Sequence, residues 1–309
     1  MKGLLRTKAI NSDHHLTDTG LRRILGPLDL TLLGIGAVIG AGIFVLTGVA
    51  AATQAGPAII LSYVIAGLAC AFAGLAYAEL AAAIGGCGSA YGYSYAGFGE
   101  LVAWIIGWDL ILEYAVAVSA VAIGWSAYAN NALQAAGLAL PPTLLKGPLE
   151  GGLINLPAAA IVLILGLLLM LGVRQSVRFN ATMVLIKLLA IGVFISIAFS
   201  HVDPANWSPF MPFGWSGVIG GAALVIFAYL GFDAVSTAAE EARNPQRDLP
   251  IGILASLAFC TLIYILTAGL LTGVVPYTTL NVGSPVADVV LRLGYPWGAG
   301  LVAAGAIAG

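Results

Sequence analysis

Long apolar runs separated by short polar stretches form the dominant pattern of this chain. We predict helices near residues 28–53, 58–84, 99–134, 156–173, 179–199, 215–240 and 250–273, and the opening of an eighth near Gly294. Most of these runs approach or exceed the roughly 20 residues that an α-helix needs to cross a bilayer. Helices satisfy their own backbone polar groups in hydrocarbon, so the pattern predicts an all-α polytopic membrane protein.

The composition excludes several other classes of protein. Hydrophobic residues make up 60% of the chain and charged residues only 8%, whereas soluble domains carry about 25% charged residues. A net charge of −2 gives no indication of nucleic acid binding. The three cysteines and three histidines show no metal-ligand spacing, and no Ser-His-Asp arrangement is evident. We therefore expect no metal, no cofactor, no catalytic residue and no enzyme activity.

The distribution of charge predicts the orientation of the helices. The polar N-terminus lacks a signal-peptide core and is predicted to be a cytosolic tail over residues 1–26. With the N-terminus inside, nine of the twelve Lys and Arg residues lie on the cytosolic side, as the positive-inside rule favours. We predict a multi-pass protein of the plasma (inner) membrane with a cytoplasmic N-terminus.

The last apolar stretch, YPWGAGLVAAGAIAG, ends at Gly309 without a polar cap or a flanking charge. A helix that stopped there in mid-bilayer would leave its last carbonyl groups and a carboxylate in hydrocarbon. We therefore expect a C-terminally truncated fragment of a longer protein, cut within helix 8.

The stretch GIGAVIGAGIF, residues 34–44, places four glycines inside the first apolar run. Each Gly weakens a helix interior by about 1 kcal/mol relative to Ala. A dinucleotide-binding fingerprint does not fit, because Ile39 occupies the place of its last glycine and no βαβ context follows. Two interpretations stay open: helix packing through Gly36 and Gly40, or a break that offers backbone N–H groups to an anionic ligand.

A break in the first helix predicts a second break in a second repeat. The stretch FAYLGFDAVSTAAEEARNPQRDLP, residues 227–250, supplies one, because Gly231 interrupts the apolar run and Asp233 follows it. Placing a carboxylate at that depth in the membrane costs free energy, so such a residue usually has a function. Asp233 could also cap the second half of the helix, and that role fits a break equally well.

Two further charged residues lie inside apolar runs. Lys187 in MVLIKLLAIGVF is either a structural ammonium paired with carbonyl groups or an amine that releases a proton, since burial disfavours its charged form. Glu113 in DLILEYAV is either a substrate-side or proton-relay carboxylate or a hydrogen-bonding residue of the core. The residues alone leave these alternatives open.

Five motifs carry a resemblance to a known family. LGIGAVIGAGIFVLTG, YAEL, GSAYGYSYAGFGE, GWDLILEY and FAYLGFDAVSTAAEEARNPQRDLP occur in this order. Together they resemble permeases of the cationic amino acid transporter type, in the amino acid–polyamine–organocation superfamily. The resemblance extends over essentially the whole chain from about Leu21 to Arg292. One departure is IGGCGSAY, where members of the family often carry Pro shortly before GSAY.

The resemblance implies the LeuT fold, with helices 1 and 6 broken around a central site. It implies a transmembrane transporter domain over 27–309, with a first five-helix repeat over about 27–200 and an incomplete second repeat over about 215–309. The expected substrate-binding residues are those at the two breaks: Val38, Ile39, Gly40, Ala41, Gly42, Phe227, Ala228, Leu230 and Gly231. The substrate carboxylate is expected at the N–H groups of Ala41 and Gly42, and its ammonium group at carbonyls of the helix 6 break.

The resemblance also implies a mechanism. In related proton-coupled permeases an ammonium group in helix 5 contacts the helix 1 break, and Lys187 matches that position. We expect secondary active transport of L-amino acids by alternating access, coupled to protons, with Glu113 and Asp233 as candidate gating or polar-site residues. Alternatives are an amine, polyamine or amino acid exchanger, or a nutrient sensor of the same fold that does not transport. The expected partners are the amino acid, protons and the lipid bilayer; protein partners are unknown.

Overall fold

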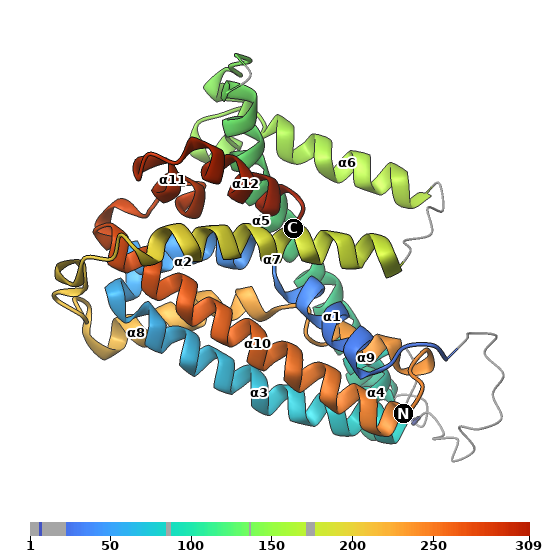
Figure 1. Ribbon diagram of the computed structural model, residues 1–309. Helices are drawn as coiled ribbons and strands as arrows, with labels where there is room; N and C mark the ends of the chain where they lie inside the picture. The colour runs from blue at the N-terminus through green and yellow to red at the C-terminus, as the bar shows by residue number, and fades with distance from the viewer. Residues whose placement is uncertain (1–5, 8–22, 85–87, 136, 171–176) are drawn as a thin grey trace. The chain divides into compact units, whose positions relative to one another are not determined.

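The computed structural model describes residues 6–7, 23–84, 88–135, 137–170 and 177–309 (Figure 1). Within these ranges the regular structure is helical, and the β-structure consists of two isolated bridges, between Leu25 and Ala242 and between Leu145 and Asn155. Most of the expected cytosolic tail lies outside the described residues. The all-helical architecture agrees with the prediction from the apolar pattern.

Five described helical segments are long and apolar enough to cross a membrane: Gly42–Ile84, Glu100–Gln134, Thr182–Phe199, Gly214–Glu240 and Pro245–Val274. Shorter apolar helices cover Pro27–Val38, Leu156–Leu167 and Pro296–Ile307. The chain is therefore a polytopic membrane protein. The shortness of Pro27–Val38 follows from the break in the first apolar run.

Most predicted helices agree with the structure to within a few residues. The α-helices are α1 (Pro27–Val38), α2 (Thr47–Ala50), α3 (Ile59–Ile84), α4 (Ser89–Gly97), α5 (Glu100–Ala135), α6 (Leu156–Met170), α7 (Val177–Phe199), α8 (Gly214–Val225), α9 (Ala234–Thr237), α10 (Pro245–Val274), α11 (Pro285–Arg292) and α12 (Pro296–Ile307). Sequence analysis missed α4 and α11. Both are too short and too polar to appear as apolar runs, which were the signal used to find helices.

The first and sixth apolar runs are not single α-helices. The first divides into α1, the π-helix η1 (Gly42–Leu46), α2 and a second π-helix η2 (Ala51–Ala55). The sixth divides into α8, the 3₁₀-helix η7 (Ile226–Tyr229), α9 and a further 3₁₀ turn, η8 (Ala238–Glu240). The structure therefore has the broken helices 1 and 6 expected from the glycine positions.

The described chain forms two compact units, and each is considered by itself. The first comprises residues 1–38, 67–116 and 229–261, and the second comprises residues 39–66, 117–228 and 262–309. The divisions at Val38–Ile39 and Ala228–Tyr229 fall at the two helix breaks. The chain thus passes from one unit to the other at both breaks, and it also does so within α3, α5 and α10.

In the first unit, α1 packs closely against α9 and α10 through small residues. A Cβ atom on Gly34 would lie 2.5 Å from Ser256 Oγ, and one on Gly252 would lie 2.7 Å from Leu30 Cβ. Short parallel pairing adds to this contact, since the Arg243 N–H donates to the Leu25 carbonyl oxygen over 2.9 Å. The segment before α1 and the segment after η8 are therefore joined through their backbones.

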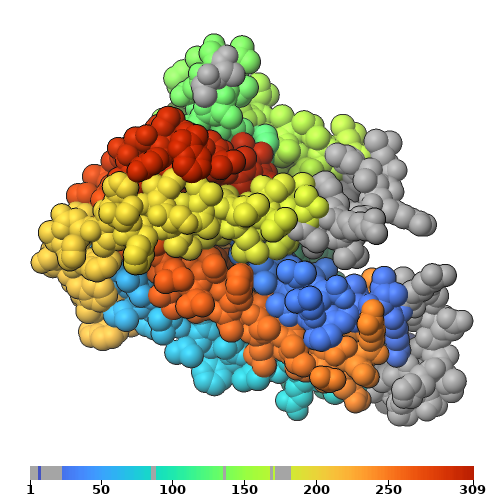
Figure 2. Space-filling view, viewed as in Figure 1, coloured from blue at the N-terminus to red at the C-terminus, as the bar shows by residue number. Residues whose placement is uncertain are grey.

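In the second unit, α7 lies along α12, and α12 also packs against α11 (Figures 1 and 2). Small side chains permit the approach of α7 and α12: a Cβ atom on Gly305 would overlap Ala190 Cβ. Two buried tyrosine rings, Tyr63 and Tyr264, lie 5.3 Å apart between their centroids. The Tyr63 hydroxyl also shares a hydrogen bond of 2.6 Å with Thr47 Oγ1, which joins this ring pair to the second half of helix 1.

Candidate functional site

The first apolar run breaks at its glycine-rich centre. α1 ends at Val38, Ile39 and Gly40 form a bend, and helical geometry resumes at Ala41 and continues into η1. The first N–H groups of a helix have no acceptor within that helix. Ala41 and Gly42 therefore offer backbone donors at the start of a second helical stretch. A helix N-terminus of this kind favours an anionic group.

Gly42 lies where no side chain fits. A Cβ atom at this position would be 2.5 Å from both Cα and Cβ of Ala228. At Gly40 the nearest atom to such a Cβ would be the Gly309 carbonyl oxygen, 4.0 Å away. The packing interpretation is therefore wrong for Gly40, and close approach occurs at Gly42 instead. The start of η1, after the first break, and η7, before the second, therefore approach backbone to backbone within the second unit.

Lys187 reaches the first break from α7. Its Nζ donates a hydrogen bond to the Ile39 carbonyl oxygen over 2.9 Å, and its side chain is only 6% exposed. The bend at Ile39 interrupts the helical hydrogen-bond ladder, so a carbonyl there needs another donor. The ammonium group supplies one. The structure thus places the only basic residue of the α7 interior directly against the backbone break.

The second break lies between η7 and α9. Leu230–Asp233 form a turn, and Gly231 has a φ of +104°, in the region that favours glycine. A Cβ atom on Gly231 would also lie 2.8 Å from the Ala37 carbonyl oxygen. Two separate requirements, backbone conformation and close packing, therefore call for glycine at this position.

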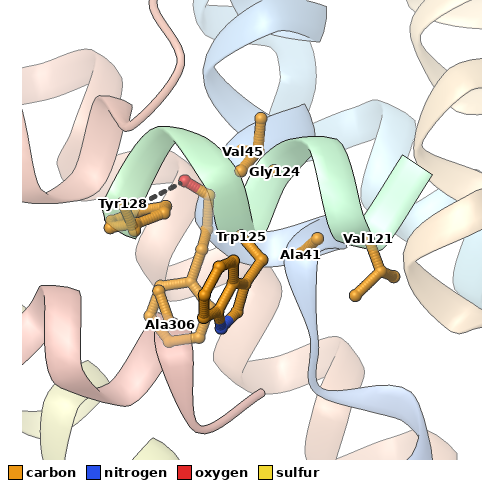
Figure 3. Close-up of a pocket in the computed structure, with 8 residues that line it drawn as sticks. Ala41, Val45, Val121, Gly124, Trp125, Tyr128 and Ala306 are labelled. Atoms are coloured by element: carbon orange, nitrogen blue, oxygen red, sulfur yellow. Dashed lines mark hydrogen bonds between the residues drawn. The ribbon is translucent and has the colours of Figure 1, made fainter. Parts of the chain in front are cut away.

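Two tyrosines that sequence analysis missed hold carbonyl groups near the breaks. The Tyr264 hydroxyl donates to the Ala228 carbonyl oxygen over 2.9 Å, and the Tyr128 hydroxyl donates to that of Phe44 over 2.8 Å (Figure 3). A carbonyl oxygen has two lone pairs, so Ala228 can still accept from a ligand. The sequence feature that could have identified them is a tyrosine inside an apolar run, because a buried hydroxyl group needs a hydrogen-bond acceptor.

Asp233 occupies the N-cap position of α9, but its side chain makes no capping hydrogen bond. Its Oδ2 accepts from the Tyr114 hydroxyl over 3.2 Å, and the side chain is only 6% exposed. Glu113, next to Tyr114 on α5, interacts electrostatically with Asp233. Within the described ranges neither carboxylate forms an ion pair. The first unit thus holds two nearby carboxylates without a cationic partner at salt-bridge distance.

The sequence-predicted residues divide between the two units. Lys187 lies in the second unit. The same unit holds the residues from Ile39 onward at the first break and those up to Ala228 at the second, namely Ile39, Gly40, Ala41, Gly42, Phe227 and Ala228. The first unit holds Val38, Leu230, Gly231, Glu113 and Asp233. Contacts within the second unit join the helix 1 break to Lys187 and to Ala228. Contacts within the first unit place Gly231 beside Ala37, and Asp233 beside Tyr114.

Comparison with known proteins identifies the family to which these broken helices belong. Residues 25–309 match the family described as amino acid permease. The chain belongs to this family. The match includes both breaks and Lys187, and it agrees with the amino acid–polyamine–organocation resemblance carried by the motifs.

Relatives of this permease have several stated substrates. The chain is 50% identical over 312 residues to the methylthioribose transporter of Bacillus subtilis (strain 168), and 50% identical over 317 residues to the branched-chain amino acid permease BcaP of the same organism. Each alignment covers 100% of this chain and 68% of the relative. Human cationic amino acid transporter 4 is 40% identical over 297 residues, which are 94% of this chain and 47% of that protein. All three names describe transporters.

The close approach at Gly42 generates a prediction for this permease. Gly42→Ala should strongly reduce transport, because its Cβ would collide with the backbone of Ala228 and push the two breaks apart. Overpacking of this kind costs about 1–3 kcal/mol. Gly192→Ala is the matched control, since a Cβ on Gly192 meets no atom within 4 Å. Uptake and thermal stability of both purified variants in proteoliposomes test this, and full activity of Gly42→Ala would contradict it.

Proposed function

We propose that this permease carries out secondary active transport of L-amino acids by alternating access. The observation that carries the proposal is the bend at Ile39 and Gly40, which leaves the N–H groups of Ala41 and Gly42 at the start of a helix. Broken helices of this kind form substrate sites in secondary transporters. The relatives named as amino acid permease and cationic amino acid transporter support this assignment.

The two ends of an amino acid match the two breaks. The carboxylate binds the N–H groups of Ala41 and Gly42, where the helix dipole is positive. The ammonium group binds carbonyl oxygens of Phe227, Ala228 and Leu230, at the end of a helical segment where the dipole is negative. Contact between Gly42 and Ala228 supports a short distance between these two halves of the site.

Coupling to protons rests on Lys187. Its ammonium group is buried and donates to the Ile39 carbonyl oxygen, so loss of its proton would remove the charge from this contact and weaken it. A cation fixed there also opposes Na⁺ at the same place. Glu113 and Asp233 are proposed as proton-relay or gating carboxylates, since Asp233 bonds to Tyr114, the neighbour of Glu113, and neither has a salt-bridge partner in the described part of the first unit.

The architecture proposed for this function is the LeuT fold, with an inverted five-helix repeat over about 27–200 and a second repeat from about residue 215. The N-terminus is proposed to be cytoplasmic and the protein to lie in the plasma (inner) membrane, on the basis of its Lys and Arg distribution. The breaks in the first and sixth apolar runs support this arrangement because each interrupts the first apolar run of a proposed repeat.

Methylthioribose transport is the second candidate function, because one relative at 50% identity bears that name. A thiosugar carries neither a carboxylate nor an ammonium group, so it would leave the helix-end dipoles at the breaks without a charged ligand. Uptake of labelled amino acids and of labelled methylthioribose by the full-length protein, with and without a pH gradient, decides between them. Uptake of methylthioribose alone would overturn the amino acid assignment, and absence of any uptake would favour a sensor.

Replacement of Lys187 by Ala should abolish uptake driven by a pH gradient, because the amine that holds the Ile39 carbonyl oxygen is removed. The matched control is Lys146→Ala, at an exposed lysine outside the breaks. Proteoliposomes with an imposed pH gradient provide the measurement. If Lys187→Ala keeps the proton dependence of the parent protein, the proposed coupling role is wrong.

Asp233→Asn should lower gradient-driven uptake by at least about tenfold, which corresponds to about 1.4 kcal/mol. The amide keeps an oxygen that accepts from Tyr114 but cannot exchange a proton at neutral pH. Asp109→Asn, at an exposed position of α5, controls for loss of a carboxylate in the same unit. Equal uptake by the two variants would show that Asp233 serves only the structure.

A further inference from the structure

Two buried tyrosines of the second unit each support one of the two broken helices. Tyr63 lies on α3 and Tyr264 on α10, two helices that run side by side (Figure 1), and both side chains are fully buried. Their ring centroids are 5.3 Å apart, and the ring planes make an angle of 54°. This is the spacing of an aromatic pair in direct contact, so the two rings link α3 to α10.

Tyr63 supports the first turn of the second half of helix 1. Its hydroxyl shares a hydrogen bond of 2.6 Å with Thr47 Oγ1. Thr47 bonds back to that turn, because its Oγ1 donates to the Ile43 carbonyl oxygen over 2.9 Å and its N–H donates to the Gly42 carbonyl oxygen. Gly42 carries one of the two N–H groups assigned to the substrate carboxylate. The turn that carries this donor is therefore connected to Tyr63 through Thr47.

Tyr264 supports the end of the first half of helix 6. Its hydroxyl donates to the Ala228 carbonyl oxygen over 2.9 Å. That oxygen is one of the acceptors assigned to the substrate ammonium group. The 3₁₀-helix η7 ends one residue later, at Tyr229, and the last carbonyl groups of a helical segment have no donor within that segment. Tyr264 therefore supplies a donor and fixes the position of this oxygen.

The two supported backbone segments also touch each other. A Cβ atom on Gly42 would lie 2.5 Å from the Ala228 Cα atom. Together with Thr47 and the tyrosine pair, this approach closes a circuit of contacts within the second unit, and all of its side chains are buried. In such a circuit of packed and hydrogen-bonded groups, the donors at the first break and the Ala228 carbonyl oxygen cannot separate unless a contact is lost.

The number of carbon atoms between its two charged groups determines how an amino acid fits this separation. A β-amino acid has one more methylene group than an α-amino acid, which moves its nitrogen by up to about 1.5 Å, the length of one C–C bond. Hydrogen bonds between N and O form over a range of only about 0.5 Å. Donors and acceptors held at a fixed separation therefore bind one of the two classes much better. This step rests on the proposed function.

We propose that Tyr63 and Tyr264 are positioning residues that fix the separation between the N–H groups of the first break and the carbonyl oxygen of Ala228, and that this separation makes the permease select α-amino acids over β-amino acids. Neither hydroxyl contacts the substrate in this proposal. Tyr63 acts through Thr47, and Tyr264 acts through the backbone of η7. The selection therefore concerns the charged groups of the substrate and is independent of its side chain.

The experiment measures, in proteoliposomes, uptake of the labelled α-amino acid that the full-length protein transports fastest and of its labelled β-homologue. Tyr63→Phe and Tyr264→Phe each keep the ring contact and remove one hydroxyl. Each should lower the ratio of α- to β-amino acid uptake at least about tenfold and raise KM for the α-amino acid more than it lowers the maximal rate, because a displacement of about 1 Å can cost about a hundredfold. Tyr91→Phe, at an exposed tyrosine of the first unit, is the matched control and should leave the ratio unchanged.

A second pair of variants decides the question if a tyrosine variant fails to fold. Thr47→Ser keeps the hydroxyl that bonds to Tyr63 and should keep the ratio of the parent protein. Thr47→Val has nearly the same shape without the hydroxyl and should lower the ratio as Tyr63→Phe does. Thermal stability of each purified variant separates loss of folding from loss of selection. Equal ratios in Thr47→Ser and Thr47→Val would contradict the positioning role.

The outcomes distinguish this inference from the proposed function. If the parent protein transports no α-amino acid, the proposed function fails and the inference fails with it. If it transports the α-amino acid and its β-homologue equally, or if both tyrosine variants keep the ratio of Tyr91→Phe, amino acid transport stands and the positioning role is overturned. A lowered ratio in both tyrosine variants, with the ratio kept in Thr47→Ser, supports it.

Discussion

The structure depends on how the backbone polar groups exposed by the two helix breaks are satisfied in apolar surroundings. An intact helix meets this requirement by itself, but a broken one leaves donors and acceptors that side chains or ligands must pair. Lys187 donates a hydrogen bond to the Ile39 carbonyl oxygen, and Tyr264 donates one to the Ala228 carbonyl oxygen. The donors at Ala41 and Gly42 are the part of the site assigned to a ligand. Structural pairing and the proposed substrate recognition therefore use neighbouring backbone groups at the breaks.

Glycine makes these breaks possible, although it does so differently at each position. Gly231 adopts a φ of +104° that other residues rarely reach, whereas Gly42 lacks a side chain because Ala228 is 2.5 Å from the place of its Cβ. A Cβ atom on Gly40 would lie 4.0 Å from the Gly309 carbonyl oxygen, an ordinary contact, so close packing does not require glycine there. Conformation therefore requires glycine at Gly231, and close packing requires it at Gly42.

In the proposed function, the backbone groups at the breaks recognise the parts of the substrate that all α-amino acids share. Backbone groups at the breaks suit the carboxylate and ammonium that every α-amino acid carries, so they give no information on the side chain. A small cavity beside Ala41 is apolar, and its two polar side chains are already hydrogen-bonded.

The sequence by itself determined the membrane class, the approximate helices and the two places where they break, because apolar length and interrupted helical patterns are local properties. It also singled out Lys187 and Asp233, since a charge within an apolar run is conspicuous without any structure. Only the tertiary structure decided their partners, because Ile39 and Lys187 are 148 positions apart in the chain, and Tyr114 and Asp233 are 119 apart. The same holds for the correction at Gly40 and for the roles of Tyr128 and Tyr264. Each depends on which distant backbone lies within a few ångströms, and a linear pattern of residue types does not contain that distance.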